Sequence, residues 1–202
     1  MKVDEWLGFF KRHKEKKLFS LSDLVQLTGE DSSSLSVQLT RLVKADVIRR
    51  AAHMWYENPF TSLSVEEISM VIRYPSYLSM EYALSKHGVL SQATYTLTLI
   101  STKLPYTYRT NQAVYEYHQI CKSLFWGYRR EGIVLTAEPE KALLDFIYIR
   151  CANAGKLPVG GAASLVNDMD LSEFNFEKLY QYSKKFSPRT RRIITELNIL
   201  KT

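Results

Sequence analysis

A stretch near the N-terminus carries the most restrictive pattern in the sequence, a series of helix start and stop signals. Ser20 and Asp23 have the spacing of a capping box, in which each side chain bonds the amide of the other residue. Gly29 follows the apolar positions of that helix, where a helix-ending glycine is preferred. A second helix begins at Asp31 or Ser32, both of which are good N-cap residues. Two short helices joined by a tight turn are typical of a helix-turn-helix.

The second of these helices has an apolar side and a polar side. Leu35, Leu39 and Leu42 recur at helical spacing and are predicted to face the core. The opposite side then carries short hydrogen-bonding groups, one apolar group and two cations, which suit base edges and phosphates in a major groove. This side consists of Ser33, Ser34, Val37, Thr40, Arg41 and Lys44. The alternative is an ordinary exposed helix face.

A basic hairpin is expected directly after this helix. Val47–Arg50 is predicted as a strand and Met54–Tyr56 as its return, with Arg49, Arg50 and His53 at or near this hairpin, the wing. Cations at such a hairpin contribute most to binding where they contact the DNA backbone or the minor groove. The helices and the hairpin together predict a winged helix-turn-helix that binds DNA, although the hairpin lacks the glycine often found before its aromatic residue.

The chain is long enough for two small domains. Residues 1–60 are predicted to form the winged helix-turn-helix domain, with a further helix at about 4–14. Residues 61–202 are predicted to form a mixed domain with an antiparallel sheet and helices, so that the fold class is α+β. The expected strands are 94–100, 106–109, 114–120, 125–128 and 133–135. Sequential short strands with tight connections favour antiparallel pairing.

The helices expected in this second domain span 64–74 and 79–88, begin again at Glu138, and end the chain at 176–185 and 188–200. Pro139 suits the first position of the central helix, since proline lacks the amide that this position leaves unbonded.

Composition and charge narrow the function classes. No apolar run approaches the roughly 18 residues that a membrane span needs. The N-terminus is a poor secretory signal, so a cytoplasmic protein is expected. Cys121 and Cys151 are far apart in the sequence and are predicted to be buried free thiols rather than a disulfide or zinc ligands. A net charge of +6 favours polyanionic partners, although its distribution matters more than its total.

No group of residues supports a catalytic, cofactor or metal site, and an enzyme is not expected. Gly160-Gly161 followed by Asp168 and Asp170 loosely resembles a nucleotidyltransferase site, but the gap is short. Asp170 is instead predicted to cap the turn that follows it. Structural roles are also expected for His87, Glu138, Glu140 and Asp145.

Two further surfaces leave alternatives open. An aromatic cluster in the predicted sheet is interpreted as its core or as a surface that stacks on bases or docks a partner. It comprises Tyr95, Tyr106, Tyr108, Tyr115, Tyr117, Phe125, Trp126 and Tyr128. A second basic patch surrounds the helix start at Ser187, where cations oppose the helix dipole and favour an anionic partner such as DNA or RNA. It comprises Lys184, Lys185, Arg189, Arg191 and Arg192, and a solvated helix face is the alternative.

Two segments of the second domain match a known pattern. They are PSYLSMEYALSKHG (75–88) and AEPEKALLDFIYIR (137–150), and the matching positions are Ser76-Tyr77, Ala83-Leu84, His87-Gly88 and Pro139–Leu143. With the N-terminal pattern before them, they make nearly the whole chain similar to the AbiEi family.

This resemblance implies the antitoxin and transcriptional repressor of a bacterial abortive-infection, or phage defence, pair. Such a protein binds inverted repeats of operator DNA in its own promoter, where two copies are expected. It also counteracts a nucleotidyltransferase toxin, without needing a stable complex. The alternative is a protein-interaction module that binds a toxin directly, with DNA binding secondary.

Overall fold

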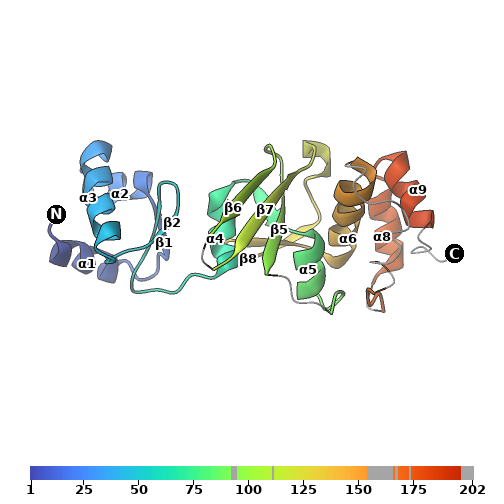
Figure 1. The fold of residues 1–202 in the computed structure, drawn as a ribbon, viewed down its shortest axis with the longest axis horizontal. Coiled ribbons are helices and arrows are strands. Elements are labelled where there is room, and N and C mark those ends of the chain that lie inside the picture. Colours follow the sequence, from blue (N-terminus) through green and yellow to red (C-terminus); the bar gives the residue numbers. More distant parts are fainter. Residues whose placement is uncertain (92–94, 111, 154–165, 167, 173, 197–202) are drawn as a thin grey trace. The chain divides into compact units, whose positions relative to one another are not determined.

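The structure of the chain is a computed structural model that divides into two compact units, Met1–Ile72 and Arg73–Thr202 (Figure 1). It describes residues 1–91, 95–110, 112–153, 166, 168–172 and 174–196. The fold class is α+β, as predicted. The division expected after residue 60 lies after Ile72. The amine of Lys17 donates to Glu67 at 2.9 Å, which ties the helix that begins at Val65 to the first unit.

The first unit is built from helices around a small antiparallel sheet. Its elements are α1 (Val3–Arg12), β1 (Leu18–Ser20), α2 (Leu21–Thr28), α3 (Ser32–Lys44), β2 (Arg50–Ala52), β3 (Trp55–Glu57) and α4 (Val65–Ile72). β3 lies between β1 and β2 and pairs with both. The strand expected at 47–50 begins only at Arg50, because the amide of Val47 bonds the carbonyl of Leu42 at 3.0 Å in the turn that closes α3.

The core of this unit is aromatic on one side and aliphatic on the other. α1 contributes three rings that pack against one another, and α3 contributes three leucines at helical spacing. These six side chains are Trp6, Phe9, Phe10, Leu35, Leu39 and Leu42, and all are at most 5% exposed. Burial of such apolar surface is the main force that holds α1 and α3 together.

The predicted helix caps are confirmed. The hydroxyl of Ser20 accepts from the amide of Asp23 at 3.0 Å, and the Asp23 carboxylate accepts from the amide of Ser20 at 2.7 Å. Gly29 ends α2 with a φ of 72°. Asp31 caps α3 by accepting from the amides of Ser33 and Ser34, both at 2.9 Å. These bonds satisfy amides that have no partner inside a helix, and they fix where α2 ends and α3 begins.

The second unit combines a six-stranded sheet with helices. Its elements are β4 (Ser76–Leu78), α5 (Met80–Lys86), β5 (Thr96–Ser101), β6 (Tyr106–Arg109), β7 (Val114–Gln119), the 3₁₀ turn η1 (Lys122–Leu124), β8 (Tyr128–Glu131), β9 (Val134–Ala137), α6 (Pro139–Ile147), the π-helical η2 (Tyr148–Asn153), α8 (Phe176–Ser183) and α9 (Pro188–Glu196).

The prediction of an antiparallel sheet is wrong, because the sheet is mixed. Its order is β6-β7-β5-β4-β9-β8, and the pairs β5–β7 and β4–β9 are parallel. β7 inserts between β5 and β6, so that β6 forms one edge. The assumption that neighbours in sequence pair with each other therefore holds for β4–β5, β6–β7 and β8–β9 but fails for β5 and β6.

Two strand predictions also change. The strand expected at 125–128 is wrong: the amide of Phe125 bonds the carbonyl of Lys122 in a turn, Gly127 has a φ of 77°, and pairing starts at Tyr128. β5 was expected to be half-buried, but Leu97–Ser101 is buried on both faces. The start of α5 covers the threonine side, where the hydroxyl of Thr98 donates to the carbonyl of Ser79 at 2.7 Å and accepts from the amide of Tyr82 at 3.1 Å.

α6 occupies the centre of the second unit. Figure 1 shows it between the sheet and the pair α8 and α9, and each residue of Glu140–Ile147 is buried. Pro139 occupies its first turn, as predicted. Among the described helices, none combines the length and the apolar character that crossing a membrane requires.

Three smaller predictions complete the comparison. Asp170 caps its turn, as expected, by accepting from the amide of Ser172 at 3.0 Å. Cys151 is buried, as expected, whereas the expectation of a buried Cys121 is wrong. Cys121 is exposed because it lies in the loop before η1, where its sulfur is 3.1 Å from the hydroxyl of Ser123.

Candidate nucleic-acid interface

α3 presents one continuous exposed side. Leu35, Leu39 and Leu42 point into the core, as predicted, which turns the opposite side outward. Of the six residues expected there, Ser34 is half-buried and the others are exposed: Ser33, Val37, Thr40, Arg41 and Lys44. The structure therefore brings the predicted contact residues onto one helix face.

The N-terminal end of this face is acidic. The hydroxyl of Ser33 donates to Asp31, and the hydroxyl of Ser34 lies 3.4 Å from Glu30. The bonds from Ser33 and from the α3 amides lower the pKa of Asp31 below its usual value. The two serines are consequently committed to acids of the same chain, and they are less available to a DNA base than the sequence indicated.

The C-terminal half of α3 carries the free cations. Among the described residues, neither Arg41 nor Lys44 forms an ion pair. The hydroxyl of Thr40 donates to the carbonyl of Ser36 at 2.7 Å, which leaves its methyl group and oxygen lone pairs on the exposed side. Val37, 52% exposed, is the apolar member of this set. This half of α3 has the chemistry that the base edges and phosphates of a major groove require.

Gln38 is a residue that sequence reasoning did not assign. Its carbonyl oxygen accepts from the indole of Trp6 at 3.1 Å, and its amide nitrogen donates to Ser34 at 3.1 Å and to Glu30. Glutamine is a common partner of adenine, but these internal bonds make Gln38 a brace between α1 and α3. No local sequence signal indicates this role, because it depends on the packing of the two helices.

The β2–β3 hairpin follows α3 and places its two arginines at its base rather than at its tip. Arg49 precedes β2, and the guanidinium of Arg50 lies 5.7 Å from the centre of the Tyr56 ring. The tip consists of His53 and Met54, both exposed. Met54 has a φ of 63°, the conformation for which a glycine is usually used. The glycine missing from the sequence pattern is thus replaced by a strained methionine.

The cations after α1 are partly neutralised. The amine of Lys16 lies 3.0 Å from Asp23, and that of Lys17 lies 2.9 Å from Glu67. Because these two lysines are already paired with acids, they are less suited to bind phosphates. The pairs cannot be read from the sequence, because each joins distant parts of the chain.

Charge is distributed unequally between the two units. Residues 1–72 contain ten Lys and Arg and ten Asp and Glu, whereas residues 73–202 contain seventeen and eleven. The entire excess of +6 therefore belongs to the second unit. The exposed side of α3 is locally basic in its C-terminal half, but the first unit as a whole has no net charge that would attract a polyanion.

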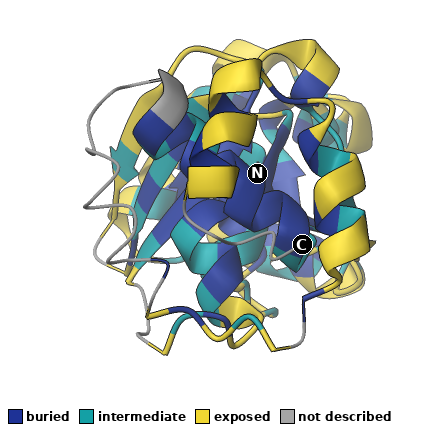
Figure 2. Ribbon diagram, turned by 90° about the vertical axis from the view of Figure 1, so that its right-hand side faces the viewer, coloured by how far each residue is buried: buried dark blue, intermediate teal, exposed yellow. Residues whose placement is uncertain are grey.

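The second basic patch lies at α8 and α9, and all five of its cations are exposed: Lys184, Lys185, Arg189, Arg191 and Arg192. Figure 2 is drawn from the side of these helices and colours their outward turns as exposed. The amine of Lys184 lies 4.4 Å from the centre of the Tyr180 ring, and that of Lys185 lies 4.2 Å from Trp126. These rings hold the two lysines on the surface.

The aromatic cluster of the sheet contains buried and exposed members. Tyr115 and Tyr117 are at most 2% exposed, while Tyr106 is 43% and Tyr95 is 93% exposed. The interpretation as core therefore holds for β7, and the interpretation as a surface stays open for β6, the edge strand.

The two segments that carry the family resemblance meet in a buried polar network. Asp145 on α6 accepts from the hydroxyls of Tyr77 (2.9 Å) and Ser79 (2.8 Å) on the other segment. The amine of Lys141 donates to Asp145 and, at 2.8 Å, to Tyr77. Burial raises the pKa of Asp145 and lowers that of Lys141, and their ion pair opposes both shifts. With all four side chains buried, this network is a structural element.

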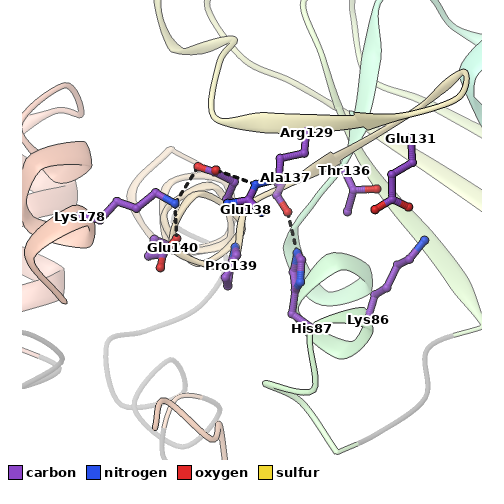
Figure 3. Close-up of a pocket in the computed structure, with 10 residues that line it drawn as sticks. All are labelled: Lys86, His87, Arg129, Glu131, Thr136, Ala137, Glu138, Pro139, Glu140 and Lys178. Atoms are coloured by element: carbon purple, nitrogen blue, oxygen red, sulfur yellow. Dashed lines mark hydrogen bonds and ion pairs between the residues drawn. The ribbon is translucent and has the colours of Figure 1, made fainter. Parts of the chain in front are cut away.

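A pocket of about 480 Å³ lies beside the start of α6 (Figure 3). Glu138 and Glu140 project toward Lys178, whose amine lies 3.0 and 3.3 Å from them. His87 contacts the carbonyl of Ala137 at 2.8 Å, in line with the structural role expected of it. In the described part of the chain, no three His, Cys, Asp or Glu side chains are grouped to hold a metal ion.

The remaining candidate acids add no chemistry to this pocket. Asp168 is exposed and Asp170 caps a turn, and Gly160-Gly161 lie outside the described residues.

No protein-family model matches the chain, and no curated protein matches it.

Proposed function

We propose that the chain is a DNA-binding transcriptional regulator whose first unit acts as a winged helix-turn-helix. The observation that carries this proposal is the orientation of α3, whose leucines face inward and whose exposed side carries Val37, Thr40, Arg41 and Lys44. The order of α2, α3 and the β2–β3 hairpin supports it, since a recognition helix followed by a hairpin suits a major groove and the adjacent backbone.

The proposed roles follow from the chemistry of each side chain. Arg41 and Lys44 bind phosphates or guanine edges, and Val37 and Thr40 contact base edges, including a thymine methyl. Arg49 and Arg50 reach the backbone beside the groove. Ser33 and Ser34 tune sequence choice less than the others, because Asp31 and Glu30 hold their hydroxyls.

The test compares duplexes made from the region upstream of the gene and from the same bases in scrambled order. Wild-type protein should prefer the upstream duplex, and Arg41→Ala with Lys44→Ala should lower the affinity for it. If both cations touch phosphates, the slope of log affinity against log salt should fall by about 2. Lys11→Ala with Lys14→Ala, two exposed cations of α1 and the turn after it, is the matched control. Undiminished binding after the α3 substitutions would refute the assigned face.

We further propose that this regulator is the antitoxin of an AbiEi-type pair and represses its own promoter through inverted repeats. The support is the sequence resemblance of residues 75–88 and 137–150. These segments pack together through the buried network, and two of its members, Tyr77 and Lys141, are matching positions. The proposed toxin is a nucleotidyltransferase encoded in the adjacent gene.

Co-expression tests this part separately. The chain should restore growth to cells that express the adjacent gene, and the α3 double variant should do so equally well. The rival function, direct binding of a toxin, is favoured by the exposed Tyr106 on the edge strand β6. Co-purification of both proteins that is lost with Tyr106→Ser would support that rival.

A further inference from the structure

The first unit supplies no net positive charge for DNA binding. Contacts of Lys and Arg with phosphates supply a large share of the affinity of most proteins for DNA. Residues 1–72 are neutral overall, and two of their lysines are paired with acids of the same unit. A further cationic surface would strengthen DNA binding by this chain, and the excess charge lies in residues 73–202.

One segment of the second unit concentrates this charge. The nine residues 184–192 contain five cations and no acid. All five cations are exposed, and none forms an ion pair with a described acid. Three of them lie in the first two turns of α9, whose first turn has no acidic residue. They oppose the positive end of the helix dipole, an arrangement that is unfavourable until an anion binds.

The buried side of α9 fixes the direction of these arginines. Thr190, Ile193 and Ile194 are buried against the rest of the unit. At about 100° per residue, Arg192 then lies near the middle of the outward side, with Arg189 and Arg191 on its flanks. The arginines thus spread over a convex helix surface, which suits the repeated phosphates of a strand better than one small anion.

We infer that α8 and α9 form a second DNA-contacting surface, in which Lys184, Lys185, Arg189, Arg191 and Arg192 bind the phosphate backbone of a duplex without reading its sequence. This inference rests on the proposed function, since it assigns to the second unit the electrostatic part of the same DNA binding. Arginine suits this role because its planar guanidinium bonds two phosphate oxygens at once.

The experiment measures the salt dependence of binding by the full chain, on upstream and scrambled duplexes. In the patch variant, Arg189, Arg191 and Arg192 are all changed to Gln. Loss of three phosphate contacts should lower the salt slope by about 2.7, and wild-type affinity should fall about 40-fold more than that of the variant between about 50 and 200 mM salt. The decrease in the salt slope should be equal on both duplexes, and the preference for the upstream duplex should persist.

Two further variants test whether the change in slope depends on the position and on the charge of the substituted residues, and circular dichroism tests whether the variants fold. Lys103→Gln, Arg109→Gln and Arg130→Gln remove the same charge from exposed positions elsewhere in the second unit and should leave the slope near that of wild type. Changing the three α9 arginines to Lys keeps the charge and should also keep the slope. Circular dichroism should show the same helix content for all three variants.

The outcomes distinguish the two proposals. A patch variant that keeps the wild-type slope, or a control variant with an equal loss, overturns the second surface. A slope that falls for single-stranded RNA but not for duplex DNA overturns it as well. Equal wild-type affinity for upstream and scrambled duplexes instead contradicts the proposed regulator function, while a lower slope of the patch variant would still support this surface. Absence of any duplex binding overturns both.

Discussion

The amine of Lys141 donates to the carboxylate of Asp145, one turn further along α6, and both side chains are completely buried. The rings of Tyr77, Trp126 and Phe186 surround the amine, with their centres 5.2–5.3 Å away. A buried charge is tolerated only where its partners are complete. Because Asp145 also accepts from Tyr77 and Ser79, the pair joins α6 to β4 and to the start of α5.

Removal of one member of this pair should be strongly destabilising. Lys141→Met leaves the Asp145 charge without its counter-ion and should lower the free energy of unfolding by ~3–5 kcal/mol. Lys141→Met combined with Asp145→Asn should cost less than the sum of the two single changes, because no isolated charge remains. Urea unfolding followed by circular dichroism measures all three variants. A cost below ~1 kcal/mol for Lys141→Met would show that the pair has no such role.

Gly127 is required by the same cluster. Its φ is 77°, and a Cβ there would lie 2.9 Å from Cγ of Lys141. Gly127→Ala should therefore combine backbone strain of ~1–2 kcal/mol with overpacking of ~1–3 kcal/mol. Gly132→Ala is the matched control, since Gly132 has a φ of 60° and nothing within 4 Å of its Cβ position. Equal costs for the two substitutions in urea unfolding would contradict the close contact with Lys141.

These residues show which parts of the fold a sequence can predict. The caps at Ser20, Gly29 and Asp31 were predicted because each depends on residues at most four positions away. Gly127 and its neighbours were predicted as a strand, because nothing nearby in the sequence indicates Lys141 against that glycine. The order of the sheet depends on where β7 inserts, which is also decided by distant contacts.

The candidate interface follows the same division. The outward side of α3 was predicted from the spacing of Leu35, Leu39 and Leu42, a local pattern. The bonds of Gln38 to Trp6 and Glu30, and the ion pair of Lys17 with Glu67, join positions up to fifty residues apart. Such bonds decide which polar side chains stay available to a ligand, so the sequence predicted the face of α3 better than the residues on it that are free to act.

The tip of the β2–β3 hairpin offers a test of backbone strain. Met54 has a φ of 63°, which costs a non-glycine residue ~1–2 kcal/mol. Met54→Gly removes this strain, but the more flexible glycine loses ~0.5–1 kcal/mol more chain entropy on folding. A net increase of ~0.5–1 kcal/mol in the free energy of unfolding is therefore expected. Asp46→Gly, at a φ of 53°, should give no gain, because aspartate tolerates this conformation. Urea unfolding compares the two, and a loss with Met54→Gly would contradict the assigned strain.

The carboxylate of Glu138 should make the stability of the second unit depend on pH. It accepts from Tyr182 at 2.8 Å, Lys178 at 3.0 Å and Arg129 at 3.1 Å. Burial by itself would raise the pKa of Glu138, but these three bonds outweigh burial and hold it below its ordinary value of 4.5. Because the folded pKa is the lower one, this stabilisation is complete above about pH 4.5 and is lost as the pH falls through the folded pKa.

Glu138→Gln tests this dependence, because glutamine keeps the size of the side chain without the titrating group. The variant should be less stable than wild type at about pH 7, and the difference in unfolding free energy should shrink as the pH falls below about 4.5. Glu131→Gln, at an exposed position lining the same pocket, is the matched control and should differ little from wild type across the series. A Glu138→Gln difference that stays constant down to about pH 3 would mean that the three bonds do not stabilise the charged carboxylate.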